Sequence, residues 1–268
     1  MLSHSLTILA FMIDIASIII LVAVGIAGGM VGSILGVGGG IIFTPTLALL
    51  GFQPTSVSST SLIAVAFTSI SSTLSYARQR RIKYETAFKL AILSAPGAVL
   101  GAYLSAIIST ELFTLIFSVI LISAVIYMLF NSHFKERKVE KGESQYHQPV
   151  AYFCAFAAGV VSSLFGVGGG IIFVPLLLIM LGMRMYEAAP TSQFVIMISA
   201  LIGLATHVIL GHPAYFHALS LAVGAFAGGL IGAQLLGRLR ERLLQIFLSI
   251  YLLLVACRLI FQVAEDAL

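Results

Sequence analysis

The chain has 268 residues, of which 60% are hydrophobic and only 9% are charged, and its formal net charge is +4. An average soluble domain is about 45–50% apolar and about 25% charged. So little charge cannot cover a folded chain of this length in water, which argues against a cytosolic enzyme or a nucleic-acid-binding protein. The composition is typical of a polytopic membrane protein, since each spanning helix needs about 20 apolar residues.

Apolar runs follow one another along the chain, and we predict helices for them because lipid offers an open backbone no hydrogen-bond partner. They cover residues 8–35, 41–52, 60–76, 86–108, 112–130, 150–165, 171–182, 190–209, 215–236 and 243–263. No positively charged segment precedes the first run, which predicts a membrane helix there and not a cleaved signal peptide. The long hydrophilic stretch at 131–149 mixes both charge signs and predicts a solvated linker.

The two sides of this linker repeat each other. The segment GVGGGIIFTP at Gly36–Pro45 returns as GVGGGIIFVP at Gly166–Pro175, with nine of ten residues identical. After one inserted residue the match continues, and Tyr84 corresponds to Tyr215. The sequence therefore predicts three parts, namely a first membrane repeat at 1–130, a linker at 131–149 and a second membrane repeat at 150–268.

Equivalent loops of the two repeats carry different charge. The segment ARQRRIKYE at 77–85 has four basic residues, whereas its counterpart LGHPAYFH at 210–217 has no lysine or arginine. Basic loops stay in the cytoplasm, so these two loops are predicted to lie on opposite faces of the membrane. The fold class that follows is an all-α polytopic membrane protein with two inverted-topology repeats. We expect the linker in the cytoplasm and both termini outside.

The glycine motifs interrupt apolar sequence ahead of two short runs, 41–52 and 171–182. At 1.5 Å per residue, about 12 helical residues cross roughly half a bilayer. Each repeat is thus predicted to hold a broken or re-entrant hairpin with a glycine tip, besides about three full spanning helices. Thr44 and Pro45 resemble the N-cap and first residue of such a short helix. Backbone N–H groups at such tips favour anions, and close helix packing is the alternative. The candidate substrate-binding residues at the tips are Gly38, Gly39, Gly40, Gly168, Gly169 and Gly170.

A second set of candidates carries hydroxyl and amide groups that donate hydrogen bonds to an oxyanion. It comprises Thr60, Ser61, Thr191, Ser192 and Gln193. Each group is expected to begin a helix, directly after Ser59 or Pro190, and the alternative to substrate binding is an N-capping role.

His207 aligns with Tyr76 of the first repeat and is a candidate for proton handling. The alternative is that it belongs to a solvated outer loop that also contains His212 and His217. The sequence contains no paired carboxylates, no metal-binding helix motif and no nucleophile elbow. We therefore predict no catalytic residues, no metal site and no cofactor, and an enzyme is disfavoured.

The doubled motif GxGGG-x-x-x-x-P, with a Thr-Ser pair about 15 residues beyond each proline, resembles the sulfite exporter TauE/SafE family. The resemblance spans about Ile20 to Phe261. It implies a permease for sulfur-containing anions, such as sulfite or organosulfonates, in the cytoplasmic membrane. We expect alternating access, with a small anion and membrane lipid as partners, and a homo-oligomer is compatible with it. The alternatives are an anion channel and a non-transport assembly or accessory protein.

Overall fold

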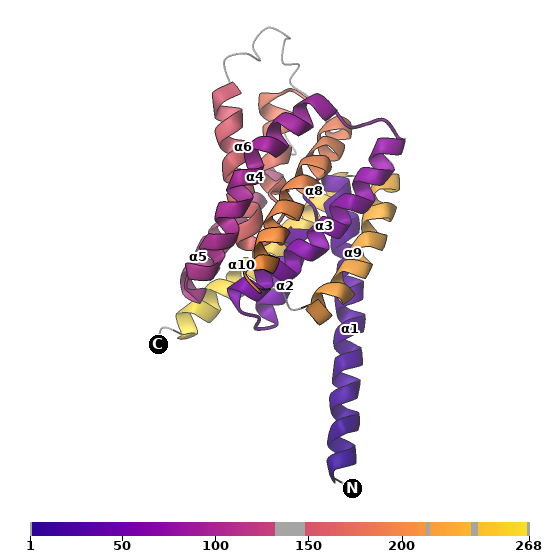
Figure 1. Ribbon diagram of the computed structural model, residues 1–268, viewed down its shortest axis with the longest axis vertical. Coiled ribbons are helices and arrows are strands. Elements are labelled where there is room, and N and C mark those ends of the chain that lie inside the picture. The colour runs from indigo at the N-terminus through magenta and orange to yellow at the C-terminus, as the bar shows by residue number, and fades with distance from the viewer. Residues whose placement is uncertain (1, 132–147, 213–214, 237–240, 267–268) are drawn as a thin grey trace.

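A computed structural model describes residues 2–131, 148–212, 215–236 and 241–266. Most of the predicted linker, 132–147, lies outside the described residues. Within the described residues the secondary structure is helical (Figure 1). The elements are α1 (Leu2–Leu35), α2 (Gly40–Leu49), α3 (Pro54–Arg78), α4 (Tyr84–Ile107), α5 (Thr110–Asn131), α6 (Gln148–Phe165), α7 (Gly170–Pro175), the π-helix η1 (Leu176–Met180), α8 (Met185–Ile209), α9 (Tyr215–Leu235) and α10 (Glu241–Asp266).

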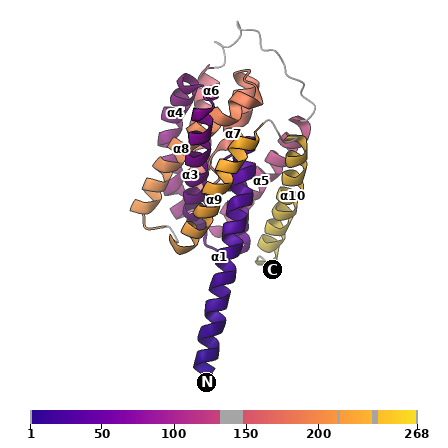
Figure 2. The same ribbon diagram turned by 90° about the vertical axis from the view of Figure 1, so that its right-hand side faces the viewer.

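Five helical segments among the described residues are long and apolar enough to cross a membrane. They are Ser17–Leu35, Pro54–Arg78, Tyr84–Ile107, Met185–Ile209 and Tyr215–Leu235. In the other helices the apolar segments with described side chains are 10–17 residues long. The helix α10 stands beside α5 at one side of the bundle (Figure 2). The prediction of an all-helical membrane protein with several spans is confirmed.

Left-handed glycines end α1 and α6 and set the start of the next helix. Gly39 and Gly169, with φ of +84° and +69°, are the N-caps of α2 and α7. The prediction that Thr44 caps the first short helix, with Pro45 as its first residue, is therefore wrong. The positive φ of glycine lets the chain reverse and resume a helix at once, so α2 begins four residues before Thr44.

Both helices after the glycine breaks are short, as predicted, but they differ in length and in how they end. The helix α2 has ten residues and remains α-helical past Pro45. Its counterpart α7 has six residues and changes at Pro175 into the five-residue π-helix η1. A proline inside a helix removes a backbone donor, and a local change of helix type is one way to absorb that loss.

Small residues bring helices of the two halves into close contact. The helix α1 packs along α9, and α4 packs along α6. A β-carbon added at Gly97 would lie 3.1 Å from the backbone nitrogen of Val160, and one at Gly228 would lie 2.9 Å from that of Met30. Close packing thus explains these glycines, because small side chains are what allow backbones to approach.

The contacts also give the helix directions. Along α1 and α9 the contacts advance together, from Gly25 beside Ala225 to Met30 beside Gly228, so these two helices are parallel. Similarly, Gly97 and Gly101 of α4 follow α6 from Phe156 towards Leu164. The chain turns back between α3 and α4 (Figure 1).

The helix α3 also runs parallel to α9, since Thr68 approaches the carbonyl of Ala225 and Gln79 that of Ala233. Because α4 turns back from α3 and is parallel to α6, the helices α1 and α6 run in opposite directions. They are the equivalent helices of the two sequence repeats.

The helices α3 and α8 pack against each other, and α3 is the most buried of the five candidate spans. The helix α3 begins at Pro54, and α8 begins at Met185 after the N-cap Arg184. The prediction that the Thr-Ser groups start these helices is wrong. The groups lie six to eight residues inside, because proline at the first position starts α3 earlier and α8 continues through Pro190.

Candidate functional site

The two glycine tips touch each other in the buried interior of the protein. A β-carbon added at Gly40 would lie 2.5 Å from both the carbonyl oxygen of Gly166 and Cα of Val167. The equivalent atom at Gly170 would lie 2.7 Å from the carbonyl oxygen of Gly36. Gly40 and Gly170 therefore allow backbone-to-backbone contact between segments that are 130 residues apart in the sequence.

Packing accounts for the other tip glycines as well. A β-carbon at Gly38 would lie 3.2 Å from Ile196 and 3.3 Å from Val65, and Gly168 faces the same two side chains. Gly39 and Gly169 lie against backbone carbonyls of α1 and α6, with 2.7 Å between each added β-carbon and the nearest carbonyl oxygen. In this arrangement the glycines bring the tips together, and apolar side chains flank the contact.

Two serines hold the tips by equivalent hydrogen bonds. The hydroxyl of Ser61 donates to the carbonyl of Gly166, and the hydroxyl of Ser192 donates to the carbonyl of Gly36, both at 2.7 Å. Thr44 also contacts Ser61, with 2.9 Å between the two hydroxyl oxygens. All of these side chains are fully buried. Each Thr-Ser pair thus contacts the glycine tip of the opposite half.

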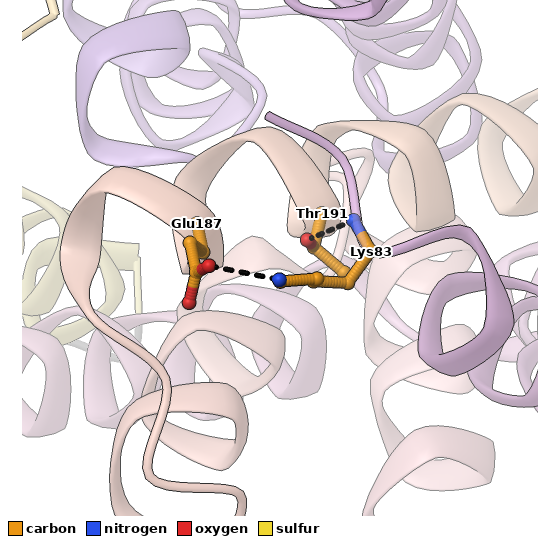
Figure 3. Close-up of polar contacts among 3 residues, drawn as sticks. All are labelled: Lys83, Glu187 and Thr191. Atoms are coloured by element: carbon orange, nitrogen blue, oxygen red, sulfur yellow. Dashed lines mark hydrogen bonds and ion pairs between the residues drawn. The ribbon is translucent and has the colours of Figure 1, made fainter. Parts of the chain in front are cut away.

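The other members of the second candidate set have different partners. The amide Nε2 of Gln193 donates to the carbonyl of Gly32 at 2.7 Å. The hydroxyl of Thr191 accepts a hydrogen bond from the backbone N–H of Lys83 at 3.1 Å (Figure 3). The hydroxyl of Thr60 is buried and has no hydrogen-bond partner among the described residues. Buried polar groups without a partner are rare, so Thr60 is a donor available to a ligand.

Further buried polar atoms in the described structure lack a partner, and they lie on residues outside both candidate sets. They include the hydroxyls of Ser69, Thr73, Ser162, Ser163 and Ser199. No motif marks these residues, since single serines and threonines are common in membrane helices and often bond to their own helix. Only burial without a partner distinguishes them.

His207 is fully buried within α8. Its Nε2 lies 3.0 Å from the carbonyl oxygen of Ser163, and its Nδ1 lies 3.0 Å from Nδ1 of His212. Because a carbonyl only accepts, Nε2 of His207 carries the proton, and in the neutral ring Nδ1 accepts from His212. Tyr76, the equivalent residue of the first half, likewise donates to the carbonyl of Ser33 at 2.9 Å. Burial lowers the pKa of His212.

Metal-binding groups of three or more His, Cys, Asp or Glu are absent among the residues that the structure describes. The charged contacts near the candidate residues lie where α4 meets α8. Lys83 forms an ion pair with Glu187, with 3.0 Å between Nζ and Oε1 (Figure 3).

The structure is that of an all-helical, multi-pass membrane protein. Its apolar spans enclose two helix breaks and a set of buried hydroxyls. The family model described as "Sulfite exporter TauE/SafE" matches residues 21–259. The chain belongs to the sulfite exporter TauE/SafE family, and the assignment drawn from the repeated motif is confirmed. The family and its relatives indicate a membrane transporter, not an enzyme.

Two curated relatives align over most of their length. "Probable membrane transporter protein YunE" of Bacillus subtilis (strain 168) is 31% identical, over 92% of this chain and 98% of the relative. "Probable membrane transporter protein MJ0441" of Methanocaldococcus jannaschii is 26% identical, over 86% of this chain and 90% of the relative. No solved structure matches the chain.

Proposed function

We propose that this protein is a secondary transporter that exports a small sulfur-containing anion, sulfite or an organosulfonate, across the cytoplasmic membrane by alternating access. The family and the relatives described as membrane transporters support a transport role. The observation that carries the proposal is the matched pair of bonds from Ser61 and Ser192 to the opposite glycine tips. A site held by the same bond from each half is suited to opening on either side.

The proposed architecture is an inverted repeat of 1–130 and 150–268, joined by a cytoplasmic linker at 131–149, with both termini outside. Three observations support the inverted repeat within this architecture. The helices α1 and α6 run in opposite directions, the contacts of α1 with α9 match those of α6 with α4, and the bonds of the tips are equivalent. Many secondary transporters place their substrate between repeats of this kind.

The proposed substrate site lies at the tips and the adjacent Thr-Ser groups. The first N–H groups of α2 and α7, which begin at Gly40 and Gly170, have no acceptor within their own helices. Together with the unpartnered hydroxyl of Thr60 and with Thr191, these are neutral donors for an oxyanion. Because the tips are in contact here, the anion is admitted only when they separate. Separation of the tips is thus the motion that alternating access requires in this proposal.

His207 is the proposed proton-handling residue. It is a buried imidazole that connects the carbonyl of Ser163 to His212. Two Nδ1 atoms 3.0 Å apart share one proton in a hydrogen bond, so a second proton breaks the contact. Proton uptake at this pair is therefore a means of linking anion movement to a proton gradient.

The test is sulfite and sulfonate flux by the purified protein in liposomes. Replacing Thr60 with valine removes the free hydroxyl at nearly constant volume. A hydrogen bond to a charged group contributes about 1.5–3 kcal/mol, so anion affinity should fall about tenfold or more. Because this hydroxyl has no partner among the described residues, stability should change little. Thr206→Val is the matched control, since among the described residues its hydroxyl bonds only to the carbonyl of Ile202 in its own helix.

Sulfur-anion flux no greater than that of empty vesicles refutes the proposal. Saturable flux with counterflow supports a carrier, whereas flux without counterflow supports the anion channel. Loss of stability and assembly in Gly39 and Gly169 variants, without any flux to lose, supports an accessory protein.

A further inference from the structure

Arg81 lies in the turn between α3 and α4, where the turn meets the start of α8. The carbon of its guanidinium group lies 3.7 Å from the centre of the Tyr186 ring, in the first turn of α8. Two residues later, the backbone of Lys83 bonds to Thr191, a proposed substrate-binding residue (Figure 3). Arg81 is thus close in sequence and in space to one of the two Thr-Ser groups.

Two nitrogen atoms of Arg81, Nε and Nη1, are buried and have no hydrogen-bond partner among the described residues. The carboxylates next to this turn are already engaged. Glu187 pairs with Lys83 at 3.0 Å, and Glu85 pairs with Lys89 at 2.7 Å. A desolvated charged donor without an acceptor is costly. Two nitrogens of the guanidinium group therefore lack the acceptor that their burial calls for.

The equivalent turn of the second half shows that the backbone does not require this arginine. The N–H of Arg81 donates to the carbonyl of Tyr76 at 3.2 Å, and the N–H of His212 donates to that of His207 at 3.1 Å. The side chain of His212, however, bonds to His207. The same turn thus forms around either residue, and only in the first half are nitrogen atoms of that side chain buried without a partner.

We infer that Arg81 binds an oxyanion at this turn, with the ring of Tyr186 covering one face of the guanidinium group. This inference deepens the proposed function, because the turn is the basic loop that the charge bias places in the cytoplasm. Arg81 would then receive the anion before it reaches Thr191. The planar fork of arginine matches sulfonate, sulfite and phosphate oxygens alike. The same chemistry has two sources, a soluble sulfur anion and the phosphate of a lipid headgroup.

The experiment measures anion binding by the full chain, independently of transport. Sulfite and phosphate are titrated onto protein in neutral detergent at constant ionic strength. Binding of phosphatidylglycerol is measured separately in nanodiscs against phosphatidylcholine. The variants are Arg81→Gln and Arg81→Lys, and Arg78→Gln is the matched control because Arg78 is an exposed arginine at the end of α3. Tyr186→Leu is a second variant that removes the ring and leaves the guanidinium in place.

We expect Arg81→Gln to weaken binding about 10- to 100-fold, which corresponds to the loss of charged hydrogen bonds. Arg81→Lys should weaken it less, Tyr186→Leu about two- to tenfold, and Arg78→Gln hardly at all. If Arg81→Gln loses binding of sulfite or phosphate, the ligand of Arg81 is a soluble anion. If it loses the preference for phosphatidylglycerol, the ligand is a lipid headgroup. Either result supports the inference.

Unchanged binding in Arg81→Gln and Tyr186→Leu overturns the inference, and so does an equal loss in Arg78→Gln, which would reflect only the charge of the loop. The proposed function is tested separately. If the wild-type protein binds phosphate at Arg81 but moves no sulfur anion, the Arg81 site is supported and the transport proposal is refuted. If flux is normal and anion binding is unchanged in Arg81→Gln, the transport proposal is supported and the Arg81 site is refuted.

Discussion

Replacing Gly40 with alanine tests whether the two glycine tips touch as described. The added β-carbon would lie 2.5 Å from Cα of Val167, whereas ordinary contacts begin at 3.4 Å. The tips would have to separate by about 1 Å, and the atoms that obstruct are backbone atoms, which do not rotate away. Overpacking of this kind costs about 1–3 kcal/mol.

Helix propensity, in contrast, predicts that the same substitution raises the stability of the protein. Gly40 is the first residue of α2 and does not have a positive φ, so alanine suits its backbone. Alanine in place of glycine within a helix stabilises by about 0.5–1 kcal/mol. Subtracting this gain from the overpacking cost leaves a net loss of about 0–2.5 kcal/mol. Tm falls by about 2–4 °C for each kcal/mol lost.

The assay is thermal unfolding of the purified variant in detergent, with flux measured at equal amounts of folded protein. Gly51→Ala is the control, because its β-carbon meets no atom within 4 Å and only its positive φ of +81° opposes alanine. It should lose some stability and retain flux per folded molecule. Gly170→Ala, on the facing tip, should resemble Gly40→Ala, and the double variant should lose less than the sum because both open one contact. A Gly40→Ala protein more stable than wild type would refute the tip-to-tip contact, because the helix-propensity gain would then stand unopposed.

Three further predictions concern polar contacts. Ser192→Ala leaves the buried carbonyl of Gly36 without its donor and should lower the free energy of unfolding by about 1–3 kcal/mol, measured by thermal or denaturant unfolding; no loss contradicts the bond. Glu187→Gln removes a partly exposed ion pair with Lys83 and should change Tm little, because such pairs contribute about 0–1 kcal/mol; a large fall contradicts this. Burial lowers the pKa of His212 in the folded state, so the stability it contributes is present above its unfolded pKa, about 6.5, and is lost on acidification below it. Tm measured from pH 8 to 5 should fall less steeply in His212→Phe, and identical slopes contradict the prediction.

The sequence by itself determined the class of protein and its internal repeat. Nine per cent charge fixes the environment as lipid, because composition acts on every residue without regard to its partners. The GVGGG motifs predicted two short helices after glycine breaks, since positive φ at those positions is a local property of glycine. The doubled motif, with proline at Pro45 and Pro175, also identified the family.

Local rules misplaced the ends of helices. A threonine and serine after Ser59 read as a helix start, yet α3 begins at Pro54 and carries Thr60 and Ser61 in its buried interior. Serine and threonine suit a cap and the inside of a packed bundle equally well. Which of the two applies depends on what surrounds the helix, and the neighbours of α3 come from distant parts of the chain.

Only the tertiary structure decided the partners of the candidate residues. Ser192 reaches the carbonyl of Gly36, which is 156 residues away, and His207 reaches that of Ser163. The free hydroxyl of Thr60 and the unpartnered nitrogens of Arg81 likewise emerge only from packing. The physical reason is that burial and hydrogen-bond satisfaction are properties of neighbours in space. A repeat shows that two segments are alike, but only the packed structure shows that their tips touch.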